Sequence, residues 1–164
     1  MGTAYVYTPV SPATLQALRE DPDAAEQMLY PDEDTGPEGQ FDVDKAWHGL
    51  HFLLTGTAYD GEAPLRWTIF GDGDLGTDLG MGGASFLTPE QVRQVADALA
   101  AIDESDLRRR FDPQAMQSQD IYPDVIWVRD GQAALEYVMQ HFEPLVAFYA
   151  ETAARGDGLV IYAV

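Results

Sequence analysis

The segment Asp44–Gly56 constrains the fold more than any other part of the chain. It contains the only lysine, one of three tryptophans and two of three histidines. At about 100° per residue, the apolar side chains of this segment and of the preceding Val43 fall on one stripe, as in a helix packed against a core. These side chains are Val43, Ala46, Trp47, Leu50, Leu53 and Leu54. Asp42 and Gly56 are placed to begin and end this helix.

The length and composition are those of one globular domain. The chain has 164 residues, of which 46% are hydrophobic and 11% aromatic. A chain of this length buries roughly two-thirds of its unfolded surface. There are no cysteines, which excludes disulfides, thiolate metal sites and a cysteine nucleophile. The first residues lack the pattern of a signal peptide, and no apolar run approaches the ~20 residues that span a bilayer. We therefore expect a cytoplasmic protein without a membrane partner.

The charge balance narrows the choice of partner. Nine basic residues against 28 acidic ones give a net charge of −19. Nucleic acids and anionic lipids repel such a chain, and the one basic cluster, Arg108–Arg110, is too short to change that. The stretch 20–44 carries ten acids and no lysine or arginine. Acidity that merely keeps the protein soluble is the simpler explanation, and a basic protein partner is the functional one.

Local patterns predict an alternation of strands and helices. Strands are expected at 3–8, 64–70 and 159–164, with the first and last in one central sheet. Helices are expected from Ser11-Pro12 and from Asp21-Pro22, and at 88–102, 103–111, 112–118 and 131–154. Pro144 is expected to interrupt the last helix near Glu143. Loops are expected at 31–40 and at 71–83, and a loop or short strand at 120–128.

Five segments in the same order carry a family resemblance. Asp44–Gly56 is similar to the signature of the YfbM-like proteins, a family of unknown function (domain of unknown function 1877). Segments 86–92, 111–116 and 120–123 match in order, followed by Phe148-Tyr149, Gly156-Asp157 and an apolar strand. The resemblance implies one compact α/β domain over 1–164, with three layers: a small mixed sheet flanked by helices on both faces. It implies no established activity and no catalytic residues.

The closest grouping of ionisable side chains in the sequence lies on one flank of the helix expected at 43–56. Asp44, His48 and His51 follow one another at i, i+4 and i+7, beside Trp47. Two imidazoles and a carboxylate are able to hold a divalent ion or to exchange protons near neutral pH. The spacing differs from that of a zincin helix. Histidines hydrogen-bonded within a core are the more frequent case, so we predict neither a metal nor a cofactor.

Two further segments are candidate sites. Asp120, Tyr122, Asp124 and Trp127 combine carboxylates and aromatic rings around Pro123, which is typical either of a pocket wall or of a rigid turn. Gly71–Gly76 matches G-x-G-x-x-G, but its aspartates would repel phosphate and no helix follows directly. The same segment departs from the EF-hand pattern. We expect a flexible loop there.

Two hypotheses of function follow from these patterns. The first is a non-enzymatic protein-binding module that presents an acidic surface to a basic partner, for example as its antagonist. Its candidate surface residues are Asp32, Glu33, Asp34 and Glu38. The alternative is a small-ligand or metal-dependent enzyme that uses the Asp44/His48/His51 helix face with Asp120. The sequence makes no prediction of oligomeric state.

Overall fold

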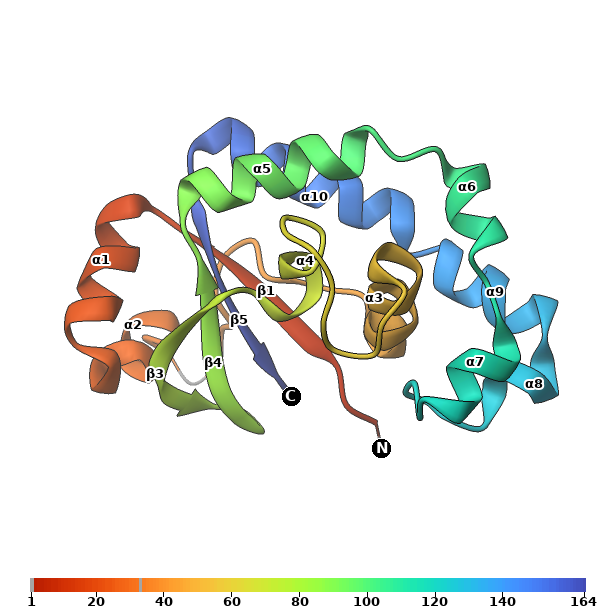
Figure 1. The fold of residues 1–164 in the computed structure, drawn as a ribbon. Helices are drawn as coiled ribbons and strands as arrows, with labels where there is room; N and C mark the ends of the chain where they lie inside the picture. Colours follow the sequence, from red (N-terminus) through yellow and green to blue (C-terminus); the bar gives the residue numbers. More distant parts are fainter. Residues whose placement is uncertain (1, 33) are drawn as a thin grey trace.

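A five-stranded sheet separates two groups of helices in the computed structural model, which describes residues 2–32 and 34–164 (Figure 1). The strands are β1 (Tyr5–Val10), β2 (Phe41–Asp42), β3 (Gly73–Leu79), β4 (Gly82–Leu87) and β5 (Gly158–Ala163). Their order across the sheet is β2-β1-β5-β4-β3, and all four pairings are antiparallel. The α/β class and the helices on both faces are therefore as expected, but the described sheet is antiparallel rather than mixed.

The first and last strands pair at the centre of the sheet, as expected. β1 and β5 are in register from Tyr5 opposite Ala163 to Val10 opposite Gly158. Five of the six residues of β5 are buried. The nearly continuous apolar sequence of this strand results from its position, because helices cover both faces of the sheet there.

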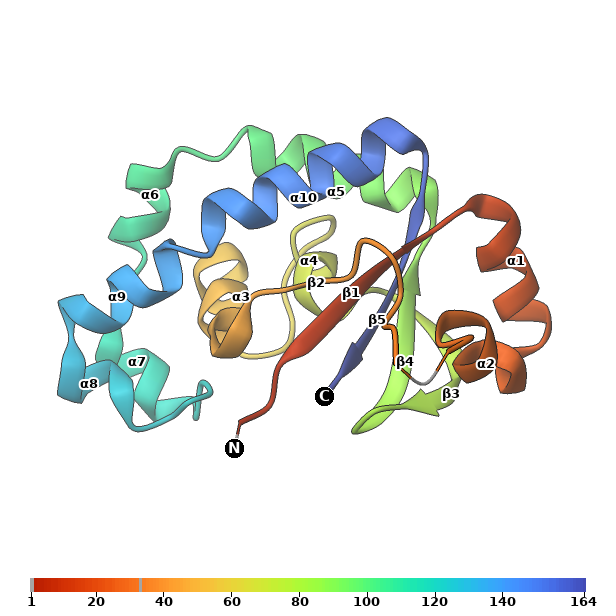
Figure 2. The ribbon, with the colours of Figure 1, turned by 180° about the vertical axis from the view of Figure 1, so that it is seen from behind.

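Each face of the sheet has its own core. Leu159 and Ile161 of β5 face the larger core, whereas Val160 and Tyr162 face the smaller one. The larger core lies under α3 (Trp47–Thr55), α4 (Trp67–Phe70), α5 (Pro89–Ala100) and α10 (Phe142–Arg155). The smaller core lies under α1 (Pro12–Glu20), the 3₁₀ turn η1 (Pro22–Ala24) and α2 (Ala25–Leu29). Figure 2 shows α5 and α10 along one side of the sheet and α1 and α2 beyond its other face.

A further group of helices lies beyond α3, away from β3 and β4 (Figure 1). These are α6 (Glu104–Arg109), α7 (Pro113–Ser118), α8 (Ile126–Asp130) and α9 (Gln132–Met139). The expected interruption before Pro144 is present, because α9 ends at Met139 and α10 begins at Phe142. Segment 120–128 forms a loop and the start of α8 rather than a strand.

The capping signals at Ser11, Thr88 and Gly56 are confirmed, whereas those at Asp21 and Asp42 are not. The side chain of Asp21 caps no helix, and Asp42 lies in β2 while α3 begins at Trp47 without a side-chain cap. The Ser11 hydroxyl accepts from the amide of Thr14 at 3.1 Å, so α1 begins where expected. Thr88 and Gln91 form a reciprocal capping box at the start of α5, the helix expected at 88–102. Gly56 ends α3 in the left-handed conformation at φ 77°.

The strand expected at 64–70 is wrong. Residues 67–70 form the single helical turn α4. Such a short helix leaves several carbonyl groups without partners inside the helix. The hydroxyl of Tyr149 donates to the carbonyl of Thr68 at 2.6 Å, and that of Tyr7 donates to the carbonyl of Ile69 at 3.1 Å. Buried tyrosines from a distant helix and strand thus stabilise the turn.

The flexible loop expected at 71–83 is also wrong, since this segment forms the β3–β4 hairpin. The glycines serve close packing rather than disorder. Gly80 has φ 58°, and a Cβ atom there would collide with the carbonyl oxygen of Ala163. The adjacent amide of Met81 donates to that same oxygen at 2.8 Å. The turn of the hairpin is therefore fastened to the end of β5.

Gly49, in the middle of α3, provides a test of this packing. A Cβ atom there would lie 2.7 Å from Cη2 of Trp127 and 2.9 Å from Cγ2 of Val138. We expect Gly49→Ala to lower the free energy of unfolding by about 1–3 kcal/mol, because overpacking a core forces side chains to shift. Urea denaturation measures the change. Helix propensity alone predicts the opposite sign, a gain of about 1 kcal/mol, and that result would contradict the packing.

Candidate functional site

The two histidines of α3 are fully buried and are held by backbone groups. Nε2 of His48 donates to the carbonyl of Ala58 at 2.8 Å, and its Nδ1 accepts from the amide of Tyr122 at 2.8 Å. Nε2 of His51 donates to the carbonyl of Asp60 at 3.0 Å. His48, which donates through one nitrogen and accepts through the other, is thus a neutral ring, whereas Nδ1 of His51 is buried without a partner among the described residues. Both imidazoles connect α3 to neighbouring loops. The helix is buried on all sides rather than along one stripe.

Aromatic rings enclose His48. Trp47 stacks on His48 with ring centres 4.8 Å apart and on Tyr122 with ring centres 5.2 Å apart. The indole of Trp47 donates to the carbonyl of Thr3 at 2.8 Å, and the hydroxyl of Tyr122 accepts from the amide of Thr3 at 2.9 Å. Three predicted site residues, Trp47, His48 and Tyr122, therefore lie together, and they hold the segment that precedes β1.

Burial lowers the pKa of both histidines. For His51 the pKa falls from 6.5 to about 4, because the desolvated ring resists protonation more than the carbonyl of Asp60 favours it. The pKa of His48 shifts in the same direction for the same reason. Near neutral pH these rings serve as hydrogen-bonding elements of the core.

The carboxylate of Asp44 points to a different partner. Its Oδ2 accepts from the hydroxyl of Tyr137 at 2.7 Å, and this bond lowers the pKa of Asp44. Burial and the neighbouring carboxylate raise the pKa of Tyr137 to about 12. Asp44 precedes α3 within the 3₁₀ turn η2 (Asp44–Ala46) at φ 50°, so the helical i, i+4 spacing to His48 does not apply.

The remaining predicted residues differ in burial. Trp127 is fully buried, and its indole donates to the carbonyl of Ile121 at 2.7 Å. Asp120 and Asp124 are exposed. Over residues 2–32 and 34–164, no three histidine, cysteine or acidic side chains are grouped closely enough to hold a metal ion. In the same residues, no helix is long and apolar enough to cross a membrane.

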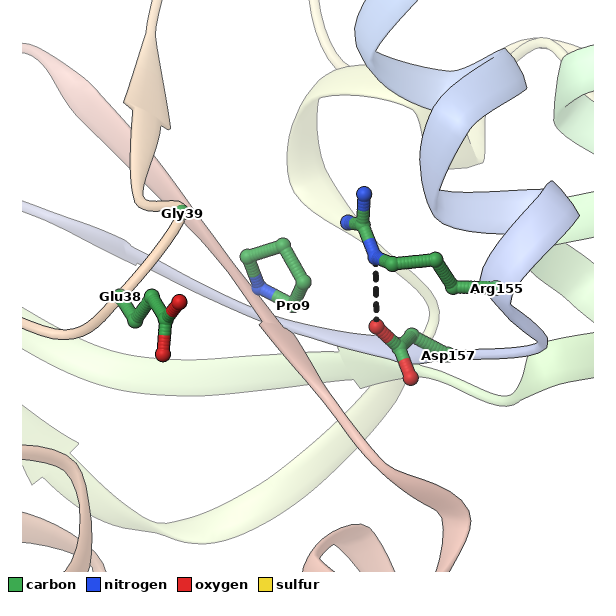
Figure 3. Close-up of a pocket in the computed structure, with 5 residues that line it drawn as sticks. All are labelled: Pro9, Glu38, Gly39, Arg155 and Asp157. Carbon is green, nitrogen blue, oxygen red and sulfur yellow. Dashed lines mark hydrogen bonds and ion pairs between the residues drawn. The ribbon is translucent and has the colours of Figure 1, made fainter.

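The predicted acidic surface lies on the loop before β2. Asp32, Asp34 and Glu38 are exposed, whereas Glu33 lies outside the described residues. Glu38 borders a hollow of about 400 Å³ that is lined by Pro9, Glu38, Gly39, Arg155 and Asp157. Figure 3 shows Glu38 on one side of Pro9, and Arg155 with Asp157 on the other. Nε of Arg155 lies 3.1 Å from Oδ2 of Asp157, so this hollow contains both signs of charge.

The fold adds acids that the sequence pattern did not assign to this surface. β3 lies against η1, where a Cβ atom on Gly76 would sit 3.6 Å from the Pro22 ring. The strand β3, which carries the exposed Asp74 and Asp78, therefore lies beside η1 at the same end of the molecule as α2 (Figures 1 and 2). A groove between Glu26 of α2 and Asp78 of β3 marks the junction.

Comparison with known proteins identifies relatives over almost the whole chain. A family model described as a domain of unknown function (DUF1877) matches residues 1–162. Protein YfbM of Escherichia coli (strain K12) is 30% identical over 123 residues, covering 72% of each chain. The crystal structure of YfbM, described as a protein of unknown function, superimposes with a TM-score of 0.75 at 24% identity. That alignment covers 99% of this chain and 100% of the other, so the fold is shared.

The buried histidines predict a loss of stability in mild acid. Between pH 6.5 and about 4 the unfolded chain binds a proton at His51 that the folded protein excludes. Stability therefore decreases as the pH falls through this window, and the His51 contribution amounts to at most about 3 kcal/mol. Urea denaturation at pH 7, 6, 5 and 4.5 measures the slope.

The matched control is His51→Gln, whose side-chain amide is able to donate to the carbonyl of Asp60 but does not titrate. We expect a shallower dependence of stability on pH for this variant than for the wild type. Identical slopes for the two proteins would mean that His51 keeps its ordinary pKa in the fold.

Proposed function

The chain belongs to the DUF1877 family of YfbM-like proteins, and within it we propose a non-enzymatic, cytoplasmic protein-binding module whose acidic surface binds a basic protein. The surface, called the acidic face below, consists of exposed carboxylates from η1, α2, the following loop and β3. Its members are Asp21, Asp23, Glu26, Asp32, Asp34, Asp74 and Asp78. The family has no assigned activity, so the proposal rests on this chain's own residues.

The observation that carries the proposal is the convergence of two acidic segments that are distant in the sequence. Residues 20–44 and 67–92 contain no lysine or arginine. The packing of β3 against η1 brings these two segments side by side. A surface of one sign steers an oppositely charged partner during encounter and repels partners of like charge.

Elsewhere on the surface, acidic side chains form ion pairs with basic side chains of the same protein. Arg108 pairs with Glu136 at 2.7 Å and with Glu104 at 3.4 Å, and Arg129 pairs with Asp130 at 2.8 Å. Basic side chains of this protein therefore neutralise acids around α6, α8 and α9. The side chains of the acidic face have no such ion pairs among the described residues, which leaves their charge available to a partner.

The enzyme alternative has less support from the geometry. His48 and His51 direct Nε2 at backbone carbonyl groups, and the carboxylate of Asp44 binds Tyr137. A general base needs a free ring nitrogen within hydrogen-bonding reach of a substrate, and the one ring nitrogen of this pair without a partner among the described residues, Nδ1 of His51, is buried. The alternative stays a prediction without a convergent set of side chains to carry it.

A labelled octalysine peptide tests the proposed function. We expect binding that is measurable by fluorescence anisotropy at low salt and weakens as salt is added, because exposed charges are screened. Octaglutamate is the negative control. Replacing Asp21, Asp23, Asp32 and Asp34 by asparagine should weaken octalysine binding at least fivefold, since each exposed pair contributes about 0.2–1 kcal/mol.

The matched control removes the same number of charges from exposed acids elsewhere, through Asp97→Asn, Asp124→Asn, Glu143→Gln and Glu151→Gln. We expect this variant to bind octalysine within twofold of the wild type. If the two quadruple variants weaken binding equally, only net charge matters and the acidic face is not a binding surface.

A further inference from the structure

A groove of about 440 Å³ lies where α2, the β3–β4 turn and β5 meet. We name it the tyrosine groove. It is lined by Glu26, Tyr30, Asp78, Leu79, Gly80, Tyr162 and Val164. These residues come from three segments that are far apart in the sequence. The groove lies within the acidic face, and it differs from the rest of that face by having apolar and aromatic walls.

A hydrogen-bond network fixes the two tyrosines. The hydroxyl groups of Tyr30 and Tyr162 form a hydrogen bond with each other. The side-chain amide of Gln40 donates to the hydroxyl of Tyr162 at 3.1 Å and to that of Thr8 at 3.1 Å. The two rings meet edge to face with centres 6.5 Å apart. Tyr162 is only 1% exposed and forms the floor of the groove, so the half-buried Tyr30 supplies its aromatic surface.

The charged groups that line the groove are both acidic. Glu26 and Asp78 take part in no ion pair among the described residues. The segments that supply the walls, 20–44, 67–92 and 156–164, contain no lysine or arginine. A purely apolar occupant would desolvate two carboxylates without compensation, and an anion would be repelled. The chemistry of the groove therefore requires an occupant that combines an apolar stem with a positive charge.

We propose that the tyrosine groove binds a lysine or arginine side chain from an extended basic segment of the partner protein. This inference rests on the proposed function and names the place on the acidic face where binding is specific. The methylene stem of such a side chain packs on Val164, which is 44% exposed, and its charged head lies between Glu26 and Asp78. Tyr30 adds the attraction of an aromatic ring for a cation.

Octalysine is again the probe, and NMR spectroscopy now identifies the residues at which it binds. In ¹H–¹⁵N spectra of the labelled full chain, we expect the largest shifts at Glu26, Tyr30, residues 78–80 and residues 162–164. Glu26→Gln with Asp78→Asn should weaken binding about fivefold or more. The matched pair Asp97→Asn with Glu143→Gln, both exposed and distant from the groove, should change it less than twofold.

The aromatic contribution has its own control pair. Tyr30→Leu should weaken octalysine binding about two- to fivefold, whereas Tyr30→Phe, which keeps the ring, should not. Thermal melts of each variant verify that the fold persists. Equal loss in the leucine and phenylalanine variants would show that the ring face plays no part.

The remaining outcomes separate this inference from the proposed function. In one outcome, octalysine binds, and it binds less tightly to the variant of Asp21, Asp23, Asp32 and Asp34 but equally well to the variant of Glu26 and Asp78. This result would overturn the proposal for the groove and leave the acidic face in place. Wild-type protein that fails to bind octalysine at low salt would overturn the groove and the acidic face together. Shifts confined to the groove and abolished by Glu26→Gln with Asp78→Asn would support both.

Discussion

The structure depends on β5, the strand that lies between two cores. Alternate residues of this strand point to opposite faces, so Leu159 and Ile161 complete one core while Val160 and Tyr162 complete the other. Its neighbours are β1 on one side and β4 on the other. A shift of register by one residue would exchange the two sets of side chains and disrupt both cores at once. The helices, the hairpin and the tyrosine groove are all positioned relative to this strand.

Local signals in the sequence predicted the elements that local forces determine. Ser11 and Thr88 start helices because their hydroxyls bond amides within the same turn, which needs no knowledge of the rest of the chain. The α4 turn was missed because Tyr7 and Tyr149, far away in sequence, satisfy its carbonyls. The hairpin at 71–83 was missed because its glycines suit close approach to β5 as well as they suit a loop. These two errors share one cause, namely that tertiary contacts override local propensity.

In the candidate site, too, the sequence predicted local features correctly and missed the contacts between distant segments. The sequence indicated that His48 and His51 belong to a helix against the core, but their bonding partners lie in loops whose course it did not predict. Asp44 was assigned to the same helical face, yet it sits in a separate turn with a positive φ. The tyrosine groove had no signal in the pattern, since Glu26, Asp78 and Tyr162 come from three distant segments. Only the acidic stretch at 20–44 pointed toward that region.

The pairing of β1 with β5 also determines how the fold would respond to mechanical force. The two strands are antiparallel neighbours, and Tyr5 lies opposite Ala163, so both ends of the described chain emerge at the same end of the sheet (Figure 1). A force that pulls these ends apart acts across the strands and loads their hydrogen bonds one pair at a time. Strands that are sheared lengthwise must instead break many bonds together. The protein would therefore unzip at low force from its own termini, although β5 is the most deeply buried strand of the sheet.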